Sequence, residues 1–204
     1  HSLRQSLHNE LHARPSLYFE EPAHVYHLAF IGDPLECKTL VEKLCHSSVD
    51  PNCVQGISRL GGHPFKWEQH AEFFTVTWVV PCERGLRDWT ALPPALSEAI
   101  EPLLPKLINS VQIIVESDSE WHQNLENYSF KDPCGSIIGG SDAVVWSDFR
   151  LCLEGTNRFL FINKGLNAYR QGRMIRRLLE IETYRMMASL SLPVARTLSA
   201  RLSD

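Results

Sequence analysis

The longest run of strand-like residues in the chain extends from His63 to Val80. Its second half is aromatic and β-branched, which suits a pleated and buried surface. In its first half, Glu68, His70 and Glu72 are two positions apart, so a strand would place all three on one face. The pattern therefore predicts one long, mostly apolar strand with a Glu-x-His-x-Glu set in its first half.

Periodicity and turn residues predict the other elements of the chain. Asp33 and Pro34 are expected at the N-cap and the first position of one helix. Residues 134–141 are punctuated by glycines and are expected to form a loop. Strands are expected at residues 24–31, 53–60, 111–115, 143–153 and 158–163, and helices at 2–12, 34–46, 93–107 and 167–190.

The order of these elements predicts an α+β fold. Up to residue 115 the order is strand, helix, strand, strand, helix, strand, which is the β-α-β-β-α-β arrangement of a ferredoxin-like antiparallel sheet. The hairpin at 143–163 would extend this sheet, and a long C-terminal helix would lie behind it. We expect a sheet domain over residues 1–165 and a basic helical arm over residues 166–204.

Charge is distributed unevenly along the chain. The net charge is −4, but the segment from Arg158 onward contains nine basic and three acidic residues. That segment is therefore +6 and the remainder −10. A basic tail on an acidic body predicts contact with an acidic surface: the body itself, another chain, an anionic membrane or nucleic acid. Nucleic acid is disfavoured, because no aromatic stacking set or known nucleic-acid motif accompanies the arginines.

The helix expected at residues 167–190 has more apolar positions than one small sheet can cover. They come partly as adjacent pairs and therefore occupy two sides of the helix. The positions are Ile175, Leu178, Leu179, Met186, Met187 and Leu190. The second side needs another surface, so this segment is predicted to form a two-fold homodimer, with its arginines beside the acidic body of the partner.

Composition excludes several classes of protein. The scattered cysteines form no C-x-x-C pair, which disfavours a zinc ribbon and a disulfide framework and predicts reduced thiols. No G-x-S-x-G nucleophile elbow is present. No stretch approaches the roughly 18 uninterrupted apolar residues of a membrane-spanning helix.

The Glu68, His70 and Glu72 set is the first candidate site. A neutral imidazole between two carboxylates suits a divalent metal such as zinc or manganese, with His12 as a further ligand from another segment. The same residues could act as general acid and base. The alternative is an ion-paired face at the sheet edge that has no chemical role.

The segment from Asn9 to Pro15 is the second candidate site. Asn9, Glu10 and Arg14 could bind an anion or small ligand, with Arg14 making a bidentate contact. The alternative is a helix C-terminus in which the polar side chains satisfy the last carbonyl groups. In either case Arg14 is expected to be buried against a carboxylate, because Pro15 restricts its backbone.

Three segments together resemble the bacterial family called domain of unknown function 3422, which comprises predicted membrane-anchored proteins. The segments are Asn9-Glu-Leu-His-Ala-Arg-Pro15, Lys66-Trp-Glu-Gln-His-Ala-Glu-Phe73, and Ser147-Asp-Phe-Arg150 through Tyr184. The resemblance implies that this chain is the N-terminal half of a longer protein, associated with the bacterial membrane through a C-terminal region absent here. It implies a cytoplasmic position for this domain. The family has no established activity, so no catalytic residues carry over.

Three functions remain open from the sequence. The first is a non-catalytic regulatory or assembly domain of a membrane-anchored protein. The second is a metal-dependent, hydrolase-like enzyme that uses Glu68, His70 and Glu72 with His12. The third is a small-ligand sensor with its site in a cleft of the sheet. The balance leans away from an enzyme.

Overall fold

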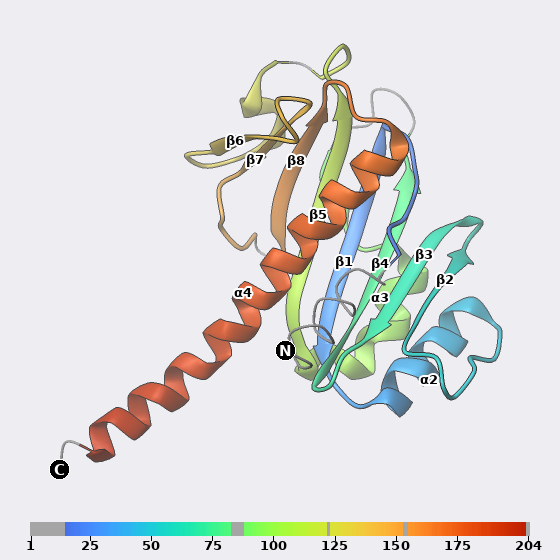
Figure 1. Ribbon diagram of the computed structural model, residues 1–204, viewed down its shortest axis with the longest axis vertical. Helices are drawn as coiled ribbons and strands as arrows, with labels where there is room; N and C mark the ends of the chain where they lie inside the picture. Colours follow the sequence, from blue (N-terminus) through green and yellow to red (C-terminus); the bar gives the residue numbers. More distant parts are fainter. Residues whose placement is uncertain (1–14, 83–87, 122, 153–154, 203–204) are drawn as a thin grey trace, which may run out of the picture.

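The hydrophobic runs of the chain form one eight-stranded sheet within the part that the structure describes, with the strand order β2-β3-β4-β1-β5-β8-β7-β6 (Figure 1). This computed structural model describes residues 15–82, 88–121, 123–152 and 155–202, with side chains up to residue 190. The strands are β1 Ala23–Ile31, β2 Gln55–Leu60, β3 His63–Gln69, β4 Phe73–Pro81, β5 Leu107–Ser117, β6 Cys134–Ile138, β7 Ala143–Ser147 and β8 Asn157–Asn163. The helices are α2 Pro34–Cys45, α3 Pro94–Ile100 and α4 Ala168–Leu202, with 3-10 turns at Glu101–Lys106 and Leu125–Tyr128.

Strand β1 is at the centre of this sheet. It pairs antiparallel with β4 on one side and with β5 on the other. The β5–β8 pair is parallel, and β7 and β6 then continue antiparallel to the edge. The mixed α+β class and the long C-terminal helix are confirmed, and so is the β7–β8 hairpin.

The two faces of the sheet are covered by different helices. In β1, Tyr26, Leu28 and Phe30 pack with the residues of α2 and α3, whereas Val25 and His27 lie on the α4 side. Figure 1 shows α4 crossing one face while α2 and α3 lie on the other. The alternation follows from the two-residue period of a strand. Each face of the sheet therefore has its own buried apolar residues.

The predicted long strand at 63–80 is wrong, because a turn divides it into β3 and β4. Residues His70, Ala71 and Glu72 form the connection, and the His70 N–H donates to the Phe73 carbonyl at 2.8 Å. The region from β1 to β5 consequently contains one more strand than the predicted β-α-β-β-α-β order. Ferredoxin-like topology is therefore not confirmed by the element order.

Other local expectations had mixed outcomes. Asp33 caps α2 as predicted, and its carboxylate accepts the N–H groups of Leu35 and Glu36 at 2.9 Å. The loop expected at 134–141 instead begins with the edge strand β6. The strand expected at 143–153 ends at Ser147. The helix expected at 2–12 lies outside the described residues.

Helix α4 is longer than predicted and leaves the sheet. It begins at Ala168, packs on the sheet through Ile175 and Leu179, and continues past Pro193 to Leu202. Figure 1 shows its C-terminal part projecting beyond the strands. The described part of the chain has no helix that is long and apolar enough to span a membrane. The division into a 1–165 domain and a 166–204 arm stays a prediction.

Candidate functional site

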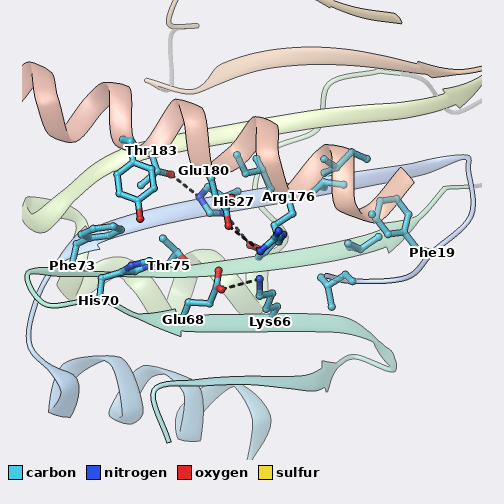
Figure 2. Close-up of a pocket in the computed structure, with 18 residues that line it drawn as sticks. Phe19, His27, Lys66, Glu68, His70, Phe73, Thr75, Arg176, Glu180 and Thr183 are labelled. Carbon is cyan, nitrogen blue, oxygen red and sulfur yellow. Dashed lines mark hydrogen bonds and ion pairs between the residues drawn. The ribbon is translucent and has the colours of Figure 1, made fainter. Parts of the chain in front are cut away.

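A narrow cavity lies between α4 and the sheet (Figure 2). Its floor is formed by β1, β3 and β4, and its roof by α4. Phe19 lies at one end, and His70 with Phe73 at the other. Its volume is about 40 Å³. Two ion pairs and a buried histidine line this space.

The floor contributes an ion pair from β3. The two-residue period that turns Phe65 and Trp67 toward α2 turns Lys66 and Glu68 toward α4. Lys66 Nζ lies 3.0 Å from Glu68 Oε1, and the side chains are only 4% and 9% exposed. Burial lowers the pKa of Lys66, and the neighbouring Glu68 carboxylate acts in the opposite direction. The pair is buried, and buried charges interact more strongly than charges in bulk water.

The roof contributes a second ion pair, one turn apart on α4. Arg176 Nη1 lies 3.3 Å from Glu180 Oε1, and both side chains are largely buried. Arg176 further lowers the pKa of Lys66, while Glu180 raises it, so the two pairs interact electrostatically. We call Lys66, Glu68, Arg176 and Glu180 the β3–α4 charge cluster. Its formal charges sum to zero.

His27 joins the sheet to α4 beside this cluster. Its Nδ1 lies 2.9 Å from the Thr77 hydroxyl of β4, and its Nε2 lies 3.0 Å from the Thr183 hydroxyl of α4. Burial, with smaller contributions from the charges of Lys66 and His70, lowers the pKa of His27 to about 3. The imidazole is therefore neutral at pH 7. Because both ring nitrogens have partners, His27 is a structural link and not a free base.

An aromatic group closes the cavity at the β3–β4 turn. The His70 ring stacks on Phe73 with centroids 4.0 Å apart and an interplanar angle of 8°. Tyr184 of α4 meets both rings edge-on, at 6.5 and 6.1 Å. Such pairs contribute beyond their buried area. The turn is thereby fixed to the middle of α4.

The segment before β1 closes the opposite end by lying across α4. A Cβ at Gly172 would be 1.9 Å from the Leu17 carbonyl oxygen, so only glycine permits this crossing. The Gln171 side chain donates to the Phe19 carbonyl at 2.9 Å. Asn163 in turn donates to the Gln171 side-chain oxygen at 2.9 Å. These buried amide contacts fix the first turn of α4 against the chain entering β1.

The structure separates the residues of the predicted Glu-x-His-x-Glu set. Glu68 is buried in β3, His70 lies in the turn and Glu72 is exposed. The prediction of one shared strand face is wrong, because the turn reverses the chain between Gln69 and Phe73. No three His, Cys, Asp or Glu side chains that could hold a metal come together in the described ranges. The zinc or manganese hypothesis gains no support from them.

Four other candidate residues fall in the N-terminal segment that the structure does not describe: Asn9, Glu10, His12 and Arg14. The expected burial of Arg14 against a carboxylate therefore remains a prediction. Sequence reasoning missed His27, Lys66, Arg176 and Glu180. A signal existed for three of them, since Lys66 alternates with aromatic residues in β3 and Arg176 and Glu180 have the i, i+4 spacing of a helical ion pair.

Two of the six cysteines, Cys37 and Cys82, are not activated nucleophiles. All six are free thiols. Burial raises the pKa of Cys37 to about 12 and that of Cys82 to about 11, so both are protonated at neutral pH. A thiolate, and not a thiol, is the reactive form. These two side chains are therefore inert packing groups.

Fold and site together define an α+β domain in which a long helix covers a buried cluster of paired charges. The chain belongs to the family described as "Protein of unknown function (DUF3422)", whose model matches residues 1–204. No curated protein and no solved structure matches the chain. The family seen in the sequence resemblance is thus confirmed, and its description assigns no role to any residue.

Proposed function

We propose that this chain is a non-catalytic regulatory or assembly domain in which α4 joins the sheet to a partner. The observation that carries the proposal is the change in burial along α4. Ile175 and Leu179 are buried on the sheet, whereas Ile181 is 64% and Leu190 45% exposed. An exposed aliphatic side chain gains roughly 1.5–3 kcal/mol when it is fully buried. The second part of α4 is therefore an apolar surface available to a partner.

The polar groups of the site support a non-catalytic role. The members of the β3–α4 charge cluster neutralise one another, and His27 is bound at both nitrogens. A general base needs an ionisable group poised near neutral pH and within reach of a substrate. The low pKa of His27 and its full burial oppose this use. The same contacts suit a joint that holds α4 in one position on the sheet.

The partner in this proposal is a second copy of the chain, arranged about a two-fold axis. Charge supports this choice, because the +6 segment that contains α4 complements the −10 of the preceding residues. Arg177 is exposed on α4, and Arg173 Cζ lies 5.4 Å from the centroid of the Tyr169 ring. Membrane association through a C-terminal region outside residues 1–204, and a cytoplasmic position, belong to the proposal and rest on the family resemblance alone.

We also infer that β3, β4, β1 and β5 form a ferredoxin-like unit with β2 added at its edge. The four strands are antiparallel neighbours in that order. Helix α2 lies between β1 and the β2–β3 hairpin in the chain, and α3 lies between β4 and β5. Both helices pack on the same face. On this view residues 1–165 are the sheet domain, and 166–204 are the arm.

Light scattering behind size exclusion tests the assembly role. The wild type is expected to have twice the 23.3 kDa mass of one chain. The double variant Ile181→Glu/Leu190→Glu places two charges in the proposed interface and is expected to be monomeric. Leu35→Glu is the matched control, because Leu35 is also exposed but lies on α2. A monomeric wild type at high micromolar concentration, or a double variant that still dimerises, contradicts the proposal.

Small-ligand sensing is a second candidate function, and the cavity under α4 is the observation that favours it. The cavity connects β3 to the helix that the assembly proposal uses. A molecule bound there would contact both elements.

A further inference from the structure

The β3–α4 charge cluster contains four charged side chains that are largely buried. Lys66 and Glu68 lie on a strand between two apolar cores, where burying charge is costly. A buried ion pair is often no more stabilising than well-packed apolar side chains of similar volume. Stability alone therefore does not explain the presence of these side chains, and a polar occupant of the cavity would.

One acceptor in the cavity is incompletely satisfied by the described chain. Glu68 Oε1 lies 3.0 Å from Lys66 Nζ, which is its one close donor among the described residues, whereas an ionised carboxylate can accept about four hydrogen bonds. Buried polar oxygens nearly always have such a donor, from protein, water or a ligand. The Glu68 carboxylate lines the cavity. Further donors to this carboxylate are therefore expected inside the cavity.

The charges of the cluster are sorted by sign along the cavity. Figure 2 shows Lys66 and Arg176 toward the Phe19 end, and the carboxylates of Glu68 and Glu180 toward the His70 end. In both ion pairs, the basic side chain is the member nearer to Phe19. The cavity consequently has a cationic end and an anionic end at a short separation. A molecule with one carboxylate and one ammonium group matches this arrangement.

The volume limits the size of such a molecule. One water molecule needs about 10–15 Å³ of cavity volume, whereas its share of volume in liquid water is about 30 Å³. The 40 Å³ cavity therefore has room for about three waters, or about 90 Å³ of liquid. Glycine and alanine are of this size, whereas an aromatic amino acid is much too large.

We propose that the cavity between β3 and α4 binds a small zwitterion of the α-amino acid class, such as glycine or alanine. Its carboxylate accepts hydrogen bonds from Lys66 and Arg176, and its ammonium donates to Glu68 and Glu180. Phe19 and Phe73 shield the ends of the site from water. The ligand bridges the sheet and α4, so it sets how firmly α4 is held. The inference names the ligand class for the sensing candidate and does not depend on the dimer.

Titration of the wild-type chain with defined probes tests the proposal, using isothermal calorimetry and amide ¹H–¹⁵N spectra. Glycine and L-alanine are the expected ligands. Acetate and methylammonium carry one charge each, and L-phenylalanine is the oversized probe. Saturable binding of glycine or alanine is expected, with shifts in β3 and α4, and with each single-charge probe at least about tenfold weaker. L-phenylalanine is expected not to bind.

Variants then assign the site. Arg176→Gln removes the guanidinium and is expected to weaken amino-acid binding by at least about tenfold, with partial recovery in Arg176→Lys. Lys131→Gln is the matched control at an exposed lysine and is expected to bind as the wild type does. Absence of saturable binding by both amino acids means that the cavity holds water only and overturns the proposal. Acetate binding as tightly as alanine, or unchanged binding in Arg176→Gln, overturns it as well. Light scattering on the same samples reports the dimer separately.

Discussion

Lowering the pH from 7 to 4 is expected to destabilise this protein through His27. The unfolded chain takes up a proton on this residue below its ordinary pKa of 6.5, but the folded chain resists it until about pH 3. The contribution to stability is therefore fully present above pH 6.5 and is lost as the pH falls toward 3. One pKa unit corresponds to about 1.4 kcal/mol, so the loss between pH 6.5 and pH 4 is about 3 kcal/mol.

The variant His27→Gln isolates this contribution from that of the carboxylates, which also take up protons in this range. Glutamine cannot be protonated, so the variant lacks the pH-dependent loss. It is less stable at pH 7, by about 1–3 kcal/mol, because the hydroxyls of Thr77 and Thr183 lose good partners. Between pH 7 and pH 4 the wild type is expected to lose about 3 kcal/mol more than the variant does.

Urea denaturation followed by tryptophan fluorescence at pH 7 and pH 4 gives the two free energies of unfolding. His46→Gln makes the same substitution at the exposed end of α2 and is expected to follow the wild type. Equal losses in the wild type and in His27→Gln would refute the reasoning. His27 would then be either accessible to protons or not enclosed by α4.

Three further predictions concern how α4 is held on the sheet. Gly172→Ala is expected to destabilise the protein by about 1–3 kcal/mol in thermal unfolding, because the new Cβ meets the Leu17 carbonyl. Alanine itself favours helices, so a stabilised variant would contradict the crossing of this segment over α4. Glu68→Leu is expected to lower the free energy of unfolding by about 3–5 kcal/mol, because it leaves Lys66 unpaired. The double variant Lys66→Met/Glu68→Leu is expected to lower it much less. Equal losses in urea denaturation would contradict a stabilising ion pair. His70→Ala is expected to lower the free energy of unfolding by about 0.5–1.5 kcal/mol through lost ring contacts. The metal content, measured by mass spectrometry, is expected not to change. Loss of a stoichiometric metal in this variant would restore the metal hypothesis.

Local sequence signals were sufficient where short-range chemistry determines structure. The start of α2 was predictable because Asp33 and Pro34 act on their own first turn. The β3–β4 turn was missed because His70, Ala71 and Glu72 are not typical turn residues. The apolar positions nevertheless change from odd numbers in β3 to even numbers in β4, which a single regular strand does not do.

Long-range packing explains the other misses. The glycine at position 135 predicts a turn, whereas the structure has strand β6 there. A Cβ at Gly135 would be 2.6 Å from the Trp146 ring, so this glycine makes room for a neighbouring aromatic side chain. The charge cluster was not predictable as a site, because Lys66 meets Arg176 only after α4 has crossed the sheet. Nothing within either segment specifies that crossing.

Hydrogen–deuterium exchange at concentrations below and above dimerisation tests the central claim most directly, since it both detects and locates the partner surface. The account predicts that amides near residues 181–190 of α4 become more protected at high concentration, while those of α2 do not change. It also predicts protection on the acidic sheet domain that faces the arginines of the partner. Protection that is independent of concentration, or that increases only at an edge such as β6, would contradict assembly through α4.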